Sequence, residues 1–235
     1  MTKCLDIALS HVSIRKFKAE PIREDDVKSI ELAALRAPSS WGLQPVTLIK
    51  VYNKDVKKAI ADAVGGQEHV AEAPLLLVFA LDFKKLFKAC ELAGIKVSQP
   101  KIGHIIAGVI DVAIASSWAS LVAEELGYGV TFIALYSNPC KIADLLRLPD
   151  LCIPLIGLTI GKPDEKPKLR PRLPKDAFSF KEIYGDIEEI GNLIHKELTN
   201  VKKDVWNIVL TPNGYYDEVS TCLLYTSDAA DDGES

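Results

Sequence analysis

Residues 105–123 read IIAGVIDVAIASSWASLVA and form the most hydrophobic stretch of the 235-residue chain. These 19 residues are enough to cross a lipid bilayer as a helix. However, the stretch contains Asp111 and three serines and is followed directly by Glu124 and Glu125, and a charged residue inside a membrane span is costly. We therefore predict a helix at the centre of the protein, buried by protein on all sides. A helix this apolar often lies in a subunit interface.

Helical and strand-like patterns alternate on both sides of this stretch. Apolar spacing and end signals predict helices at 3–10, 24–36, 54–64, 139–146 and 183–198. Apolar runs of strand length predict strands at 46–52, 75–81, 130–136 and 153–160. The run at 75–81 is continuously apolar, which is typical of a central strand covered on both faces. The alternation predicts a layered α+β (α/β) architecture without a membrane span.

The composition is that of a folded globular chain. Hydrophobic residues make up 48% and charged residues 26% of it, which is enough apolar material for a packed core. The five cysteines are scattered without CxxC or zinc-ligand spacing, and single cysteines of this kind are usually buried reduced thiols. The first residues lack the apolar segment of a signal peptide. We therefore expect a cytoplasmic protein.

The last 14 residues, 222–235, look foreign to the rest of the chain. Cys222–Asp232 reads CLLYTSDAADD, which resembles a translation of a sequencing-library adapter. The segment holds four acidic residues and no basic one, so without it the chain has 28 acidic and 28 basic residues rather than a net charge of −4. We expect a read-through tail and a missing natural C-terminus. A natural acidic tail is the alternative.

Several common motifs are missing from the chain. It contains no GxGxxG after a strand, no Walker A sequence, no GxSxG and no HExxH. The enzyme classes that depend on these motifs therefore have no support. The basic residues are spread along the chain, so nucleic acid is not expected as a partner.

Two basic segments have the chemistry to hold a phosphate group. In HVSIRKF (11–17), Ser13, Arg15 and Lys16 place a hydroxyl and two cations close together, and a guanidinium binds phosphate through two parallel hydrogen bonds. The alternative is a helix that ends in basic residues, which the helix dipole favours. In KLRPRLP (168–174), Arg170 and Arg172 flank a proline in a stiff segment, for which a solvated linker is the alternative.

Two other segments carry polar groups or glycines at the ends of predicted helices. APSSWGLQP (37–45) combines serine hydroxyls, an aromatic ring and a glutamine, which suits the lining of a small-molecule cleft. An ordinary turn into a strand is the alternative. GGQ (65–67) follows a predicted helix, where two glycines are typical of a helix C-cap.

Taken together, in order and spacing, these segments resemble the nitroreductase-like flavoproteins. HVSIRKF resembles the family's H-R-S-[IV]-R-x-[FY] opening, and APSS followed by LQP resembles its A-P-S-(x)-x-N-x-Q-P turn. LGYG (126–129) is similar to L-G-L-G, and LLRLP (145–149) with PLIGLTIGKP (154–163) is similar to L-L-x-L-P…P-L-x-G-L-x-x-G-x-P. RPRLP (170–174) is similar to the K-P-R-L-P of the NADPH-dependent nitroreductase and flavin reductase branch. The resemblance covers about residues 5–175.

The resemblance implies a nitroreductase-like fold, with a central, mostly antiparallel sheet flanked by helices. It implies an obligate homodimer with two FMN sites at the subunit interface. An FMN-binding core at 1–175 would be followed by a C-terminal extension at 176–221 and the tail at 222–235. The implied cofactor-binding residues are His11, Ser13 and Arg15 for the phosphate and ribityl chain, Arg170 and Arg172 for the phosphate end, and Ser39, Gln67, Phe132, Ile133 and Ala134 for the flavin.

Some positions depart from the family pattern. Val12 replaces an arginine, and Trp41 stands where small polar residues are usual, so that we expect Trp41 to contact the substrate. Ala134-Leu135 replaces two glycines, and side chains there would crowd the flavin.

The resemblance implies an oxidoreductase that uses FMN to pass two electrons from NADPH or NADH to nitro compounds, quinones or free flavin, in a ping-pong order. The implied reaction needs no catalytic acid or base side chain and no metal. Lys202 and Lys203 resemble the start of an R-R-D-x-W sequence in the NADPH-preferring branch and would bind the donor; a solvated lysine pair is the alternative. Two other functions stay open: an FMN carrier or redox-partner protein without turnover, and a structural domain without flavin.

Overall fold

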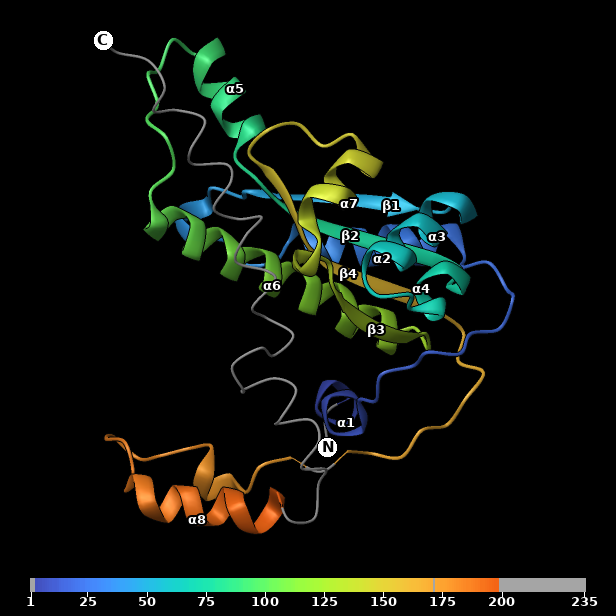
Figure 1. Cartoon of the computed structure of the whole chain (residues 1–235), viewed down its shortest axis with the longest axis vertical. Helices are drawn as coiled ribbons and strands as arrows, with labels where there is room; N and C mark the ends of the chain where they lie inside the picture. Colours follow the sequence, from blue (N-terminus) through green and yellow to red (C-terminus); the bar gives the residue numbers. More distant parts are fainter. Residues whose placement is uncertain (1–2, 171, 199–235) are drawn as a thin grey trace. The chain divides into compact units, whose positions relative to one another are not determined.

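In the computed structural model, which describes residues 3–170 and 172–198, a four-stranded sheet forms the centre of the first of two units, Met1–Lys168 (Figure 1). Its strands are β1 (Val46–Val51), β2 (Leu75–Asp82), β3 (Gly129–Ala134) and β4 (Cys152–Gly161), in the order β1-β2-β4-β3. Each neighbouring pair is antiparallel. All eight residues of β2 are buried. The prediction of a central strand in an antiparallel sheet is therefore confirmed.

Helices cover both faces of this sheet. They are α1 (Lys3–Ser10), α2 (Glu24–Leu35), α3 (Lys54–Ala63), α4 (Glu68–Glu72), α5 (Lys84–Leu92), α6 (Ile102–Glu125) and α7 (Pro139–Leu146). Three acidic residues in the first turn of α2 favour its start electrostatically. The Asn53 side chain caps α3 by accepting hydrogen bonds from the N–H groups of Asp55 and Val56. Most of these bounds agree with the sequence-based prediction, but α4 and α5 were not predicted.

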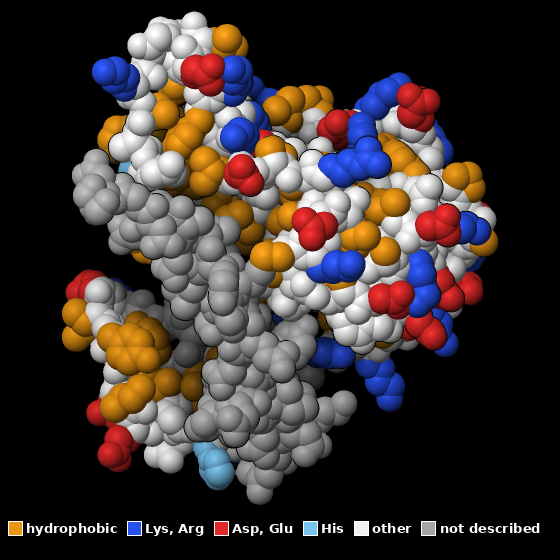
Figure 2. Space-filling model, turned by 45° about the horizontal axis from the view of Figure 1, so that its top comes forward, with side chains coloured by type: hydrophobic (Ala, Val, Ile, Leu, Met, Phe, Trp, Pro, Cys, Tyr) orange, Lys and Arg blue, Asp and Glu red, His pale blue; other side chains and the backbone are white. Residues whose placement is uncertain are grey.

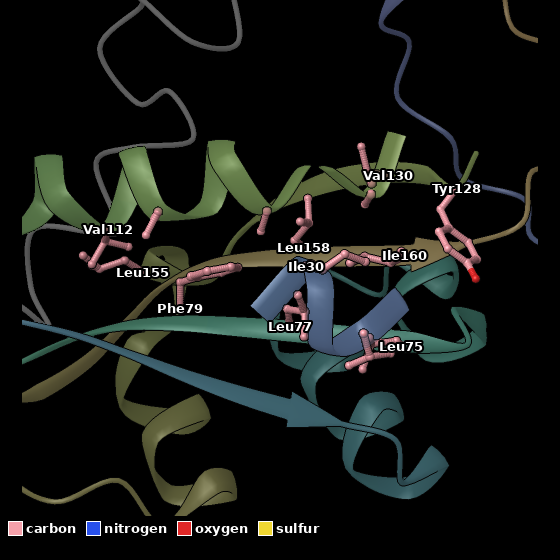
Figure 3. Packing of buried hydrophobic residues seen from close by; sticks show 14 of the residues in the cluster. Ile30, Leu75, Leu77, Phe79, Val112, Tyr128, Val130, Leu155, Leu158 and Ile160 are labelled. Carbon is pink, nitrogen blue, oxygen red and sulfur yellow. The ribbon is translucent and has the colours of Figure 1, made fainter. Parts of the chain in front are cut away.

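The larger hydrophobic core lies between the sheet and the helices α2 and α6. Leu77 of β2 and Leu158 of β4 are paired across the strands and project from the same face of the sheet, into the cluster that contains Ile30 of α2; all three are 1% exposed or less (Figure 3). Burying a side chain of this size stabilises the fold by about 1.5–3 kcal/mol. Gly108 allows α6 to lie close to β2, because a Cβ atom at this position would come within 2.3 Å of Leu81.

A second core fills the opposite face of the sheet. Its buried residues come from β1, β2 and β3, from the helices α3, α4 and α7, and from the segments that follow α3 and β3: Val51, Ile60, Ala61, Val64, Val70, Leu76, Val78, Ile133, Leu135 and Ile142. Alternate residues of β2 therefore enter different cores, as the side-chain period of a strand requires. The result is a sheet between two helical layers.

Helix α6 differs from its prediction in one respect. It was expected to be buried by protein on all sides, and within this chain that is wrong. Its buried face, which includes Asp111, Ser116 and Ser120, packs against α2 and the sheet. Its other face is exposed and apolar and contains Ile102, Ile105, Ile106, Val109, Ile110 and Trp118. By length and composition α6 could cross a membrane, but the polar groups on its packed face are those of a core helix.

The end of β3 also differs from its prediction. The strand stops at Ala134 rather than at 136, because Leu135–Ser137 form a short 3₁₀ helix. The Leu135 side chain turns into the second core and is fully buried.

The second unit, Leu169–Ser235, is described as far as residue 198. Its helix α8 (Ile187–Leu198) begins four residues later than predicted and follows a packed turn. In that turn the rings of Phe180 and Tyr184 lie 4.9 Å apart, and Gly185 fits against Phe180, where a Cβ atom would come within 2.8 Å. The predicted tail at 222–235 lies outside the described residues.

The free cysteines among the described residues differ in their surroundings. Cys152 is buried, Cys90 is half-buried and Cys4 is exposed, so the expectation of buried thiols is wrong for Cys4. Burial, together with the nearby charge of Asp82, raises the pKa of the Cys152 thiol to about 11. The thiolate is the reactive form, so Cys152 is an inert packing residue at neutral pH.

Candidate functional site

The segment 11–18 lies along the edge of the sheet, beside β3 and the residues that follow β4. The N–H of Ile14 donates to the Val130 carbonyl at 2.9 Å, and the N–H of Lys18 donates to the Lys162 carbonyl at 2.9 Å. Ile14 is buried against Gly129, where a Cβ atom would come within 2.6 Å of its side chain. The alternative of a helix ending in basic residues is therefore wrong, because α1 stops at Ser10 and carries no basic residue in its last turn.

His11, Ser13 and Arg15 occupy alternate positions in this segment. Ile14 between them is buried, whereas His11 and Ser13 are half-buried and Arg15 is exposed. Nδ1 of His11 is 2.8 Å from a carboxylate oxygen of Glu124, at the end of α6. Both side chains are partly exposed, at 27% and 17%. Glu124 thus holds the imidazole through Nδ1 and leaves Nε2 for another group.

Glu165 holds the backbone next to Arg15. Its carboxylate accepts hydrogen bonds from the N–H groups of Arg15 and Lys16, and these bonds, led by that of Arg15, lower the pKa of Glu165. The carboxylate is therefore ionised at neutral pH, while the Arg15 side chain is exposed. The segment therefore exposes the guanidinium of Arg15, a group that suits an anionic ligand.

A second polar cluster surrounds Asp111, which is 1% exposed. The carboxylate accepts hydrogen bonds from the Ser39 hydroxyl at 2.8 Å, the Ser40 hydroxyl at 3.0 Å and the Ser40 N–H at 2.9 Å. The Ser39 oxygen in turn accepts from the Gln44 N–H at 2.8 Å. Because a buried carboxylate must be well hydrogen-bonded, these bonds join the turn at 39–44 firmly to α6.

The turn has an unusual backbone. Trp41, Gly42 and Gln44 have φ values of 57°, 66° and 53°, a region that costs a residue with a side chain roughly 1–2 kcal/mol. The bonds to Asp111 offset this strain. The turn carries Trp41 fully exposed, so its ring is free to meet a ligand or a partner.

Two cavities border these clusters. One, of about 210 Å³, is lined by Ser39 and Asp111 together with residues of α2 and β1. It is smaller than the roughly 300–1,000 Å³ typical of ligand pockets. The other is an open groove of about 620 Å³ between Val12–Ile14 and the segment 163–167. The cavity beside Ser39 is therefore suited to only part of a ligand.

The glycines at 65–66 have the structural role that was expected from chemistry alone. Gly65 and Gly66 have φ values of 89° and 74°, and the Gly66 N–H donates to the Ala61 carbonyl at 2.9 Å. They end α3. Gln67 precedes α4, and its side-chain amide donates to the Val64 carbonyl at 2.9 Å.

His69, two residues further on, was not predicted as a site residue. Desolvation lowers its pKa, and the positive charge of Arg15 lowers it further, while Glu165 acts in the opposite direction. The lowered pKa leaves His69 neutral at pH 7, and its imidazole is within the electrostatic influence of Arg15.

The β3 residues divide between the two faces of the sheet. Phe132 is 43% exposed on the α6 face, whereas Ile133 is buried in the second core. Only the backbone atoms of Ile133 can therefore contact a ligand. The crowding expected from Leu135 is wrong, because this side chain also lies in the second core. Only the small side chain of Ala134 stands in place of a family glycine.

The two polar clusters lie apart within one chain. Asp111 and Glu124 are 13 positions apart on α6, which corresponds to about 20 Å along a helix axis. A single chain therefore does not bring Ser39 close to His11. Arg170 and Arg172 belong to the second unit, and Lys202 and Lys203 lie outside the described residues. Their roles stay predictions.

The part of the chain that the structure describes contains no candidate metal site. Within residues 3–170 and 172–198, no three His, Cys, Asp or Glu side chains are grouped to hold a metal ion. On the face shown in Figure 2, Lys and Arg side chains are interspersed with Asp and Glu side chains. Such a surface has little attraction for nucleic acid.

A sheet between two helical layers, with the segment 11–18 at its edge and a separate serine turn, defines an α+β protein. The chain belongs to the Nitroreductase family, whose family model matches residues 8–162. The prediction of this family is confirmed.

Relatives of known name are similar over most of their length. An "FMN reductase [NAD(P)H]" of Bacillus subtilis (strain 168) is 35% identical over 197 residues, covering 83% of this chain and 79% of the relative. An "Oxygen-insensitive NADPH nitroreductase" of Salmonella typhimurium is 29% identical over 217 residues, covering 88% and 89%.

Solved structures agree with this assignment. A hypothetical oxidoreductase from Bacillus subtilis superimposes with a TM-score of 0.88 at 30% identity, covering 97% of this chain and 98% of the other. The NADPH:FMN oxidoreductase from Vibrio harveyi, complexed with NAD+, gives a TM-score of 0.77 at 26% identity, covering 100% and 93%.

Proposed function

We propose that this protein is an FMN-dependent oxidoreductase that transfers two electrons from NAD(P)H to a nitro compound, a quinone or free flavin. The family assignment and the names of the relatives support this function. The observation that carries it in the chain itself is the edge segment, in which Glu124 holds the His11 imidazole and the exposed Arg15 side chain acts electrostatically on His69. No dinucleotide motif is present in the sequence, so FMN is favoured over FAD.

The residues of the edge segment fit FMN. Cations and a hydroxyl are the groups that bind a phosphate. The ring nitrogen Nε2 of His69, on which the charge of Arg15 acts, is buried without a hydrogen-bond partner among the described residues. When bound, FMN supplies the electron-transfer chemistry, and the protein binds and orients it.

The side chains of this chain would have different tasks. Arg15 and His11 bind the phosphate end, and Glu124 orients His11. Asp111 holds the turn that presents Ser39 and Trp41, and Trp41 stacks on the substrate. We assign no proton transfer to a side chain, and we expect donor and acceptor to use the same face in turn, in a ping-pong order.

The distance between the two clusters supports a homodimer. Ser39 and His11 are tied to residues about 20 Å apart on one α6, so a site that uses both needs a second chain. The exposed apolar face of α6 offers a surface for it. In a two-fold dimer with antiparallel α6 helices, the Ser39 turn of one protomer would approach the His11 segment of its partner.

Steady-state oxidation of NADPH and NADH with menadione as acceptor tests the activity. We expect turnover that depends on FMN. Flavin binding without turnover would instead make the protein an FMN carrier or redox partner. A cytoplasmic location remains a prediction.

A further inference from the structure

His69 lies on α4 in a position fixed by its neighbours. Val70 is fully buried in the second core, and Gln67, which precedes the helix, is bonded to the end of α3. This short helix therefore has little freedom to turn the imidazole elsewhere. Within the described residues, Nε2 of His69 is buried and has no hydrogen-bond partner. A buried polar atom is nearly always hydrogen-bonded in a folded protein. We therefore expect Nε2 of His69 to have a hydrogen-bond partner outside the chain.

The surroundings of His69 define the chemistry of that partner. The charges of Arg15 and Glu165 both act on the imidazole. The Glu165 carboxylate is already engaged by the N–H groups of Arg15 and Lys16. The guanidinium of Arg15 has only donors. A ligand that Arg15 binds must therefore carry acceptor atoms, and the influence of Arg15 on the imidazole indicates that one ligand can reach both side chains.

A neutral imidazole can supply what such a ligand needs. Burial and the Arg15 charge disfavour the imidazolium form, and the neutral ring carries one N–H group. If that hydrogen is on Nε2, it points at the ligand beside the guanidinium. The pair then offers one charged and one uncharged donor to neighbouring acceptor atoms.

We propose that His69 is a flavin-binding residue, whose Nε2–H donates a hydrogen bond to an oxygen atom of the flavin that Arg15 holds. This inference rests on the proposed function. The acceptor is either a phosphate oxygen or an oxygen of the ribityl chain or ring; both have the same hydrogen-bonding chemistry. A buried water molecule satisfying Nε2 without any flavin contact is the competing explanation.

Binding measurements with two ligands and two variants test the proposal. His69→Phe keeps a ring of similar size without a donor, and His69→Gln restores an N–H group near the position of Nε2. We expect His69→Phe to weaken FMN binding about tenfold, as loss of a hydrogen bond would, and His69→Gln to recover most of it. His195→Phe, on the exposed side of α8, is the matched control and should bind FMN normally.

The binding of riboflavin, which lacks the phosphate, shows which part of FMN accepts the hydrogen bond from His69. A loss confined to FMN assigns the bond to the phosphate, and an equal loss for riboflavin assigns it to the ribityl chain or ring; either supports the proposal. If His69→Phe binds both ligands within twofold of the unmutated protein, the proposal is wrong while the proposed function stands. If the unmutated protein binds neither, both are wrong.

A measurement on the unmutated protein covers the case in which His69→Phe does not fold. In a nitrogen NMR spectrum of the histidine side chains, His69 should be neutral with its proton on Nε2, and the Nε2 resonance should shift when FMN is added. A resonance that does not respond to saturating FMN contradicts the proposal.

Discussion

The Ser39 hydroxyl lies 2.8 Å from the carboxylate of Asp111, a residue 72 positions away in the sequence. This contact joins a strained turn to the buried face of the longest helix among the described residues. Because the hydroxyl hydrogen points at Asp111 and the oxygen already accepts from the Gln44 N–H, Ser39 has only a lone pair left for a ligand. The Ser39 hydroxyl can therefore accept a hydrogen bond from a ligand but has no hydrogen left to donate.

Asp111→Asn should loosen this turn. An amide can accept from fewer donors than a carboxylate, so we expect a loss of about 1.5–3 kcal/mol in the free energy of unfolding, together with weaker flavin binding. Urea unfolding and FMN titration measure the two effects. Asp82→Asn is the control, since Asp82 is also a buried carboxylate, which accepts from Thr47 and Lys85. Equal flavin affinity in both variants would contradict a role of the turn in binding.

Arg15→Ala should weaken FMN binding by about 1.5–3 kcal/mol, the range for hydrogen bonds to a charged group. Fluorescence titration with FMN provides the measurement. Arg36→Ala, which removes an exposed arginine at the end of α2, should leave the affinity unchanged. An affinity that is equal in both variants would make Arg15 a surface cation.

Ile110→Asp should disrupt the proposed dimer. A carboxylate in an apolar interface is left without a partner, so we expect a monomer with weakened flavin binding in light scattering and titration at micromolar concentration. Leu32→Asp on α2 is matched in exposure, at 57% against 51% for Ile110, and should remain a dimer. A flavin-loaded monomer of the unmutated protein would show that one chain is sufficient.

The raised pKa of Cys152 predicts a loss of stability at alkaline pH. The thiol of the unfolded chain deprotonates near pH 9, whereas that of the folded chain has a pKa of about 11. The stabilisation is complete below pH 9 and is lost as the pH rises to 11, by about 2 kcal/mol. Between pH 8 and 11, the free energy of unfolding measured in urea should fall more steeply for the unmutated protein than for Cys152→Ala. Parallel slopes would contradict this.

The donor preference depends on residues outside the described part of the chain. If Lys202 and Lys203 meet the 2′-phosphate of NADPH, kcat/KM should favour NADPH by about tenfold, or about 1.4 kcal/mol. The preference is modest because lysine makes a point-charge contact rather than a bidentate one. Lys202→Ala/Lys203→Ala should remove the preference and leave NADH turnover intact. A preference that survives the double substitution would exclude the pair.

Local patterns in the sequence predicted most of the fold. The apolar run at 105–123 predicted α6, and the continuous run at 75–81 predicted the central strand β2. The sequence suggested that α6 could lie in a subunit interface but did not identify which of its residues are exposed within one chain, because hydrophobicity alone does not distinguish a protein core from an interface. Lys84–Leu92 was not predicted as a helix: its apolar side chains recur at helical spacing, but no capping side chain marks its start.

The contacts of the candidate site were harder to predict. His11, Ser13 and Arg15 were found from residue type and order, but Glu124 and His69 were not, since their partners are distant in the sequence. Asp111 was noticed only as a charge that argued against a membrane span. A single acidic residue within an apolar helix is itself a signal, because a carboxylate kept in a core must have donors around it.

Identification of the bound cofactor tests the central claim most directly. The protein is purified, its visible absorption spectrum is recorded, and any flavin is released with acid and identified by chromatography, with and without prior incubation with FMN. We expect a yellow protein, or one that becomes yellow with FMN, that releases FMN in a ratio near one per chain. Release of FAD, or no bound flavin after incubation with FMN, would contradict the account.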